Sequence, residues 1–212
     1  MEPREAARLL SQTQAHARRS LDSRAPWVSL VAAVVVLAAF GIVWLNVRDQ
    51  HPFTGPSPAS LVVFYALIGV RIATVIYAYA RARTGVSGRS VEVQRAEAVV
   101  MIGALLVFYL AMIAIANNSG SHGAGFYWSL FLNGNLIATA AIWAGRSAFH
   151  KSWHEVALAV PVALIAALAA IAGPRGMWLV NAVGLCVLLL ANAAWEAWQR
   201  RATRTYPVRM GA

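Results

Sequence analysis

Six apolar runs of about twenty residues each account for most of the sequence. A helix rises about 1.5 Å per residue, so a run of about twenty residues crosses the roughly 30 Å hydrocarbon core of a bilayer. Only 12% of the residues are charged, whereas about 25% is usual in a soluble domain. The sequence therefore predicts an all-α polytopic membrane protein, a bundle of six transmembrane helices at residues 27–47, 59–80, 98–116, 126–148, 156–171 and 177–198.

Polar segments flank this transmembrane domain at both ends of the chain. Residues 1–26 are rich in charge and alanine, and Leu9, Leu10 and Leu21 fall roughly on one helical face. This pattern indicates an amphipathic helix on the inner leaflet, attracted by anionic lipid; a solvated lead-in is the alternative. Residues 199–212 form a basic cytoplasmic tail. We expect contacts with the lipid surface from Arg8, Arg18, Arg19, Arg81, Arg83, Arg200 and Arg201.

The cationic residues predict the orientation of the bundle. With both termini in the cytoplasm, fifteen of the eighteen Lys and Arg residues lie in inner segments and two lie in outer loops. Such an excess of cations marks the cytoplasmic side of a membrane protein. Seventeen of the eighteen cations are Arg, a bias associated with high-GC bacterial genes. We therefore predict a multipass protein of the bacterial inner membrane with both termini inside.

Composition also excludes several classes of function. The single cysteine, Cys186, excludes an intrachain disulfide and a multi-cysteine metal site. The net charge of +10 is explained by the loops between spans, so we expect no nucleic-acid partner. No segment between the runs is longer than about twenty residues, which leaves no room for a soluble catalytic domain. No catalytic motif or cofactor site is predicted.

Arg71 is the charged residue that stands in the middle of a predicted span. It lies about 16 Å below the outer end of that span by helical rise. A charge at such depth costs at least ~2.5 kcal/mol on insertion scales. Because helical side chains tilt toward the helix N-terminus, we expect its charge to reach outward. No acidic residue in the middle of a span offers an obvious ionic partner.

Several polar residues are predicted at a depth similar to that of Arg71. We expect them to line an outward-opening polar pocket that binds an anionic or carboxylate-bearing ligand through Arg71. The alternative is hydrogen bonding between helices, with Arg71 extended toward the surface. Successive residues are about 100° apart on a helix, so Asn133 and Asn135 point to different faces of their helix. We therefore expect only one of the two to meet Arg71. The predicted ligand-binding residues are Arg71, Asn133, Asn135, Asn181, Tyr65 and Tyr109.

Three more polar positions lie toward the predicted cytoplasmic side. Glu196 follows Asn192 by about one turn on the same face, and we expect it to form a surface ion pair near the basic tail. His150 and His154 would share a face if they were helical, which makes them weak candidates for metal ligands. No third ligand is specified, so an interfacial loop with titratable groups is the alternative.

The fifth run contains small residues at regular intervals. Ala159, Ala163 and Ala167 recur every four residues, a spacing that allows close contact between helices or between protomers. Pro161 is expected to kink or locally open this helix.

The leading functional hypothesis is a small membrane transporter or ligand-binding protein, possessing a pocket around Arg71 and forming oligomers. A non-catalytic sensor, assembly factor or regulatory anchor that acts on a protein partner through its cytoplasmic face is the runner-up. A membrane enzyme is the third hypothesis, and it depends only on His150, His154 and Glu155.

Overall fold

The computed structural model describes residues 26–82, 99–100, 102–104, 106–114 and 123–205 of the chain. Every element in this part of the chain is a helix. The predicted amphipathic helix, with Arg8, Arg18 and Arg19, lies outside the described residues, as do Arg83, the side chain of Arg81 and residues 206–212.

Four helices are long and apolar enough to cross a membrane. They are α2 (Pro26–Val47), α3 (Pro58–Ala82), α7 (Trp153–Ile171) and α8 (Gly173–Thr205). The prediction of a helical multipass membrane protein is confirmed to this extent. The other two predicted spans take different forms: residues 102–114 belong to a shorter apolar helix, and residues 124–149 are divided into α5 (Ala124–Ser129), the π-helical turn η1 (Leu130–Gly134) and α6 (Asn135–Phe149).

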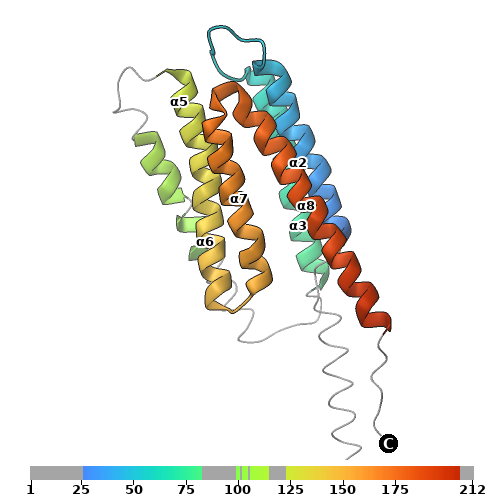
Figure 1. Cartoon of the computed structure of the whole chain (residues 1–212). Coiled ribbons are helices and arrows are strands. Elements are labelled where there is room, and N and C mark those ends of the chain that lie inside the picture. The colour runs from blue at the N-terminus through green and yellow to red at the C-terminus, as the bar shows by residue number, and fades with distance from the viewer. Residues whose placement is uncertain (1–25, 83–98, 101, 105, 115–122, 206–212) are drawn as a thin grey trace, which may run out of the picture.

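The helices form an antiparallel bundle with α8 at its centre (Figure 1). Helix α2 packs against α3 and α8, while α7 packs against α6 and α8. Helix α8 therefore joins two groups, α2 with α3 on one side and α5 to α7 on the other. The two groups diverge toward the end of the bundle that holds the turn between α6 and α7 (Figure 1).

The apolar core lies toward the opposite end, near the loop that joins α2 to α3. Phe40, Phe64 and Trp178 pack edge to face, with ring centroids of Phe40 and Phe64 5.2 Å apart and those of Phe64 and Trp178 5.9 Å apart. Val43 and Met177 are completely buried beside them. Because the core fills this end of the bundle, the divergent end is left with room for a cavity.

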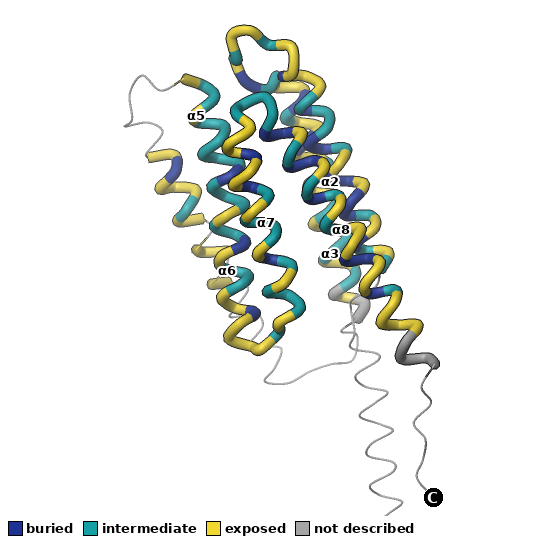
Figure 2. The backbone as a smooth tube through the Cα atoms, viewed as in Figure 1, coloured by how far each residue is buried: buried dark blue, intermediate teal, exposed yellow. Residues whose placement is uncertain are grey.

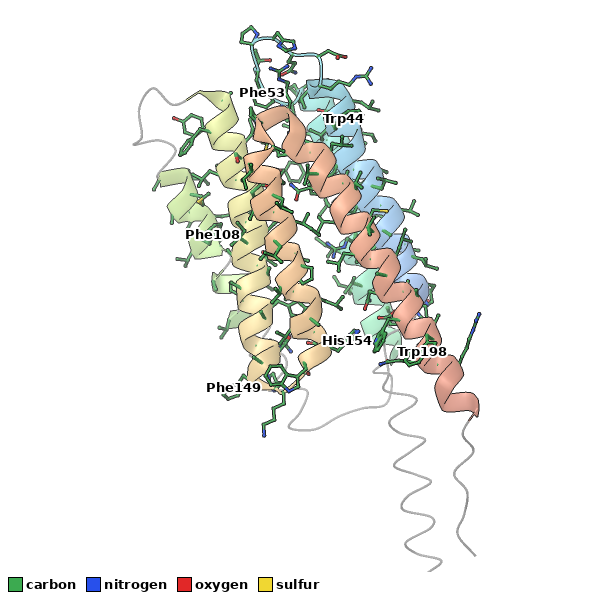
Figure 3. The ribbon with its side chains drawn as sticks, in the orientation of Figure 1. Trp44, Phe53, Phe108, Phe149, His154 and Trp198 are labelled. Atoms are coloured by element: carbon green, nitrogen blue, oxygen red, sulfur yellow. The ribbon has the colours of Figure 1, made fainter. Side chains whose placement is uncertain are left out.

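The outer surface of the bundle is apolar, as a lipid-facing surface should be. Exposed residues run along the outward sides of the helices (Figure 2). Large hydrophobic residues such as Val34, Val62 and Leu168 are among them. Aromatic side chains occupy both ends, with Trp44 near one end and Phe149 and Trp198 near the other (Figure 3), as in the aromatic belts of membrane proteins.

Helix α7 differs from its prediction in two respects. It is one continuous helix, so Pro161 does not open it locally, and the alanines buried in it are Ala159, Ala166 and Ala169. Ala167, predicted on the contact face, is exposed. A repeat of four residues advances about 400° around a helix, so it drifts about 40° per step from a fixed contact line. The buried alanines are seven and three residues apart, and the spacing of seven stays closer to a fixed contact line.

Helices α7 and α8 approach closely at Gly184. A Cβ atom added there would lie 2.7 Å from Cγ2 of Ile165, too close for a real contact. We expect Gly184→Val to lower the free energy of unfolding by about 1–3 kcal/mol, the usual effect of overpacking. Thermal unfolding of the purified protein in detergent measures this. Gly41→Val is the matched control, because no atom lies within 4 Å of a Cβ at Gly41; equal losses in both variants would contradict the prediction.

Candidate functional site

The polar side chains inside the bundle form two separate groups. The first joins the π-helical turn to α8: Asn181 Nδ2 donates a hydrogen bond to Asn133 Oδ1 (2.9 Å). Asn133 Nδ2 in turn donates to Ser129 Oγ (3.3 Å) and lies 3.7 Å from the sulfur of Met177. Asn133 and Asn181 are 2% and 0% exposed. This amide pair is thus a buried polar link between two helices, of the kind that holds membrane helices together.

Asn135 lies on another face of its helix. Its Nδ2 donates to Tyr109 Oη (2.8 Å), in an exposed hydrogen bond. Tyr65 is 63% exposed and packs its ring against Phe64. As the spacing predicted, Asn133 and Asn135 point to different neighbours.

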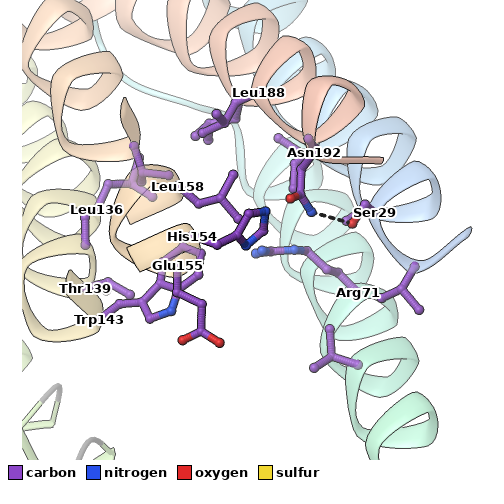
Figure 4. A pocket seen from close by; sticks show the side chains of 18 of the residues that line it. Ser29, Arg71, Leu136, Thr139, Trp143, His154, Glu155, Leu158, Leu188 and Asn192 are labelled. Atoms are coloured by element: carbon purple, nitrogen blue, oxygen red, sulfur yellow. Dashed lines mark hydrogen bonds between the residues drawn. The ribbon is translucent and has the colours of Figure 1, made fainter. Parts of the chain in front are cut away.

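The second polar group surrounds a cavity of about 470 Å³ in the divergent half of the bundle. Helices α2, α3, α6, α7 and α8 all contribute side chains to its lining. Apolar walls come from residues such as Leu136, Leu158 and Leu188 (Figure 4). The charged and polar side chains used below are those of Ser29, Arg71, His154, Glu155, Asn192 and Glu196.

Arg71 projects from α3 into this cavity, toward the His154 imidazole of α7 (Figure 4). Its Nε atom is buried without a hydrogen-bond partner. Within the described part of the chain, no hydrogen bond or ion pair to Arg71 is found. A buried guanidinium without acceptors is costly, because water no longer solvates it. Arg71 is therefore the cavity group with the greatest need for an anionic or hydrogen-bond-accepting partner.

On the α8 side of the cavity, three polar residues form a closed network. Asn192 Nδ2 donates to Ser29 Oγ and to Glu196 Oε1, both at 3.0 Å. Ser29 Oγ lies 3.3 Å from Glu196 Oε2, to which it donates. All three residues are at least nine-tenths buried. The expected surface ion pair of Glu196 is thus wrong for the described residues: α8 crosses α2 at this point and covers the carboxylate with Ser29.

His154 and Glu155 begin α7 and complete the lining. The His154 ring stacks on Trp195 with centroids 6.4 Å apart, and its Nδ1 atom is buried without a hydrogen-bond partner. Glu155 Oε2 accepts a hydrogen bond from Ser147 Oγ (2.8 Å), which joins the start of α7 to α6.

His150 and His154 do not share a helical face. His150 caps the end of α6, and the chain reverses at Lys151, where φ is 57°, before α7 begins at Trp153. The described residues contain no group of three His, Cys, Asp or Glu side chains that could hold a metal ion.

The sequence singled out Arg71 but not its surroundings. None of Asn133, Asn135, Asn181, Tyr65 and Tyr109 lines the cavity that Arg71 lines. The sequence predicted only how deep each residue lies along its span. Depth alone does not predict which neighbouring helix a side chain faces. Helix α3 packs on α2 rather than on α6. The neighbours of Arg71 are therefore Ser29, His154 and Asn192 across the cavity (Figure 4).

One signal for the missed residues was present in the sequence, since Asn192 and Glu196 share a face of the sixth run.

No protein-family model, curated protein or solved structure matches the chain significantly. The four long apolar helices make it a multipass membrane protein, and its more specific role has to be inferred from the cavity.

Proposed function

We propose that this protein binds or transports a small ligand whose anionic group pairs with Arg71. The supporting observation is the Arg71 Nε atom, which is buried beside a cavity and lacks a partner. Guanidinium groups bind carboxylate and phosphate through paired hydrogen bonds. A ligand anion would therefore supply both the charge and the acceptors that Arg71 lacks.

The dimensions and walls of the cavity support a small amphipathic ligand. Ligand pockets commonly enclose about 300–1,000 Å³ and combine apolar walls with a few polar groups. The Arg71 cavity, at about 470 Å³, has this composition, with leucine side chains from α6, α7 and α8. An aliphatic or aromatic portion of the ligand would pack against these leucines while its anionic group faces Arg71.

We also propose six transmembrane segments with both termini in the cytoplasm, in a bacterial inner membrane. The support is the distribution of cations, fifteen inside against two outside. Arg200 and Arg201 at the end of α8 would then lie near anionic lipid of the inner leaflet. In this orientation the Arg71 cavity lies in the cytoplasmic half of the bundle, so the pocket proposed here replaces the outward-opening pocket expected from the sequence.

A pair of probes that match in shape and differ in charge tests the proposed function. We expect purified protein in lipid nanodiscs to bind 4-methylpentanoate at least tenfold more tightly than the neutral 4-methylpentanamide, measured by isothermal titration calorimetry. Tenfold corresponds to about 1.4 kcal/mol, close to the lower limit of about 1.5–3 kcal/mol for a hydrogen bond to a charged group. Equal affinities for the acid and the amide would contradict an anion site at Arg71.

The proposed orientation is tested by cysteine labelling in intact cells. In a Cys186→Ala background, we expect Asp49→Cys to react with a membrane-impermeant maleimide and Lys151→Cys to react only after permeabilisation. Asp49 lies in the loop after α2 and Lys151 in the turn after α6, and both are exposed. The opposite labelling pattern would show that the termini are outside.

A further inference from the structure

The cavity contains unsatisfied polar atoms of both kinds. Arg71 Nε is a donor without an acceptor, and Asn192 Oδ1 is an acceptor without a donor. Both residues line the same cavity but belong to different helices, α3 and α8. Buried polar atoms in proteins nearly always have partners. His154 Nδ1 is a third atom of the lining without a partner. The Arg71 donor and the Asn192 acceptor suit a ligand that accepts hydrogen bonds at one end and donates them at another.

The charge of Glu196 strengthens the difference between the Arg71 side and the α8 side of the cavity. Glu196 lies one turn from Asn192, and its two carboxylate oxygens accept hydrogen bonds from the amide of Asn192 and the hydroxyl of Ser29. Both donors are neutral, so they leave the carboxylate charge uncompensated. Glu196 forms no ion pair within the described residues. The α8 side of the cavity thus presents a carboxylate and an amide oxygen, which together suit a cationic donor such as an ammonium group.

Four charged residues line the cavity, Arg71, Arg146, Glu155 and Glu196, and the Arg71 and Glu196 charges do not neutralise each other. No ion pair joins Arg71 to Glu196. Arg71 instead points toward His154 on α7, while Asn192 faces Ser29 (Figure 4). Leu158 and Leu188 belong to the same lining. The Arg71 and Glu196 charges are held apart in one cavity and do not serve as each other's counter-charge, and a single ligand can supply both counter-charges.

From this arrangement we infer that the ligand is zwitterionic, with its anionic group on Arg71 and a protonated amine on Asn192 and Glu196. The inference depends on the proposed function, because it retains Arg71 as the anion site. It adds the second recognition group and the chemical class of the ligand: a small amino acid or another compound with one cationic and one anionic group. A simple fatty acid or inorganic anion would leave the Asn192 and Glu196 side unpaired.

Matched probes that differ by one charge test this inference. Leucine is compared with 4-methylpentanoate, which lacks the ammonium group, and with 3-methylbutylamine, which lacks the carboxylate. A longer set consists of 6-aminohexanoate, hexanoate and hexylamine. Affinities are measured by calorimetry on the full-length protein in nanodiscs. We expect one of the two zwitterions to bind at least tenfold more tightly than its own acid and its own amine.

Variants test which side chains cause the preference for a zwitterion over its acid. Glu196→Gln keeps the size of the side chain and removes its charge, so it should reduce the zwitterion's advantage over its acid to less than threefold while the acid still binds. Asn192→Leu should do the same. Thr139→Val is the matched control, since Thr139 lines the cavity without belonging to either charged group, and it should retain the tenfold advantage.

The outcomes separate this inference from the proposed function. If both acids bind as tightly as the zwitterions, and Arg71→Leu weakens their binding by at least tenfold, the anion site stands and the zwitterionic ligand is excluded. If the zwitterion is preferred equally in Glu196→Gln and wild type, the assignment of the amine to Glu196 is wrong. If Arg71→Leu leaves every affinity unchanged, the anion site itself is wrong, and the zwitterion inference falls with it.

Discussion

Arg71→Leu should weaken binding of 4-methylpentanoate by at least tenfold and leave the protein at least as stable as wild type. A hydrogen bond to a charged group contributes about 1.5–3 kcal/mol, so its loss corresponds to a decrease in affinity of roughly 10–150-fold. Stability should not fall, because Arg71 makes no hydrogen bond or ion pair within the described residues. Replacing a buried charge with an apolar side chain removes a desolvation cost. Calorimetry measures the affinity and thermal unfolding measures the stability.

The two measurements together distinguish a binding residue from a structural one. A variant that loses stability but keeps its affinity would show that Arg71 supports the fold. Thr74→Val is a suitable control in the same helix: its hydroxyl donates only to the carbonyl oxygen of Val70 (2.8 Å), and it does not line the cavity. It should change neither affinity nor stability appreciably. Arg71→Lys keeps the charge but loses the planar pair of donors, and it should bind with intermediate affinity.

Asn133→Leu should be among the most destabilising single substitutions in the bundle. It would leave Asn181 Nδ2, now bonded to Asn133 Oδ1 at 2.9 Å, buried without an acceptor. An orphaned buried polar group costs about 1–3 kcal/mol. The double variant Asn133→Leu with Asn181→Leu removes both partners and should recover at least half of the loss. Thermal unfolding of the two single variants and the double variant completes the cycle.

The half-buried Asn135 nearby provides the control for this cycle. Asn135→Leu removes a hydrogen bond to Tyr109 that lies at the surface, and it should change stability by no more than ~0.5 kcal/mol. If the two single losses at Asn133 and Asn181 add up in the double variant, the two amides act independently and the prediction is wrong.

The helices could be predicted from hydropathy because a buried apolar run has few other structures available in a bilayer. Predicted spans 27–47 and 59–80 correspond to α2 and α3 within about two residues. The connection before the last helix was predicted as a loop at residues 172–176, yet α8 begins at Gly173. Gly173 has φ of 78°, which glycine adopts readily, and Pro174 suits the first turn of a helix.

The site was predicted only in part because its residues come together from distant parts of the chain. Arg71 could be found from the cost of a charge within an apolar run. The hydrogen bond between Ser29 and Asn192 joins residues 163 positions apart, and it depends on how α8 crosses α2. Such crossing angles follow from the packing of side chains between helices. A serine near the start of a span carries no sequence signal for that contact.

The junction of α7 and α8 affects how the chain enters the membrane. Ala172 alone separates the two helices. So short a connection permits only opposite orientations of the two spans, which makes them one insertion unit, a helical hairpin. Charges added to the segment after α8 would act on both helices at once, and neither could invert without the other. The side of the cavity that carries His154 and the side that carries Asn192 and Glu196 would therefore enter the bilayer together, in a fixed relative direction.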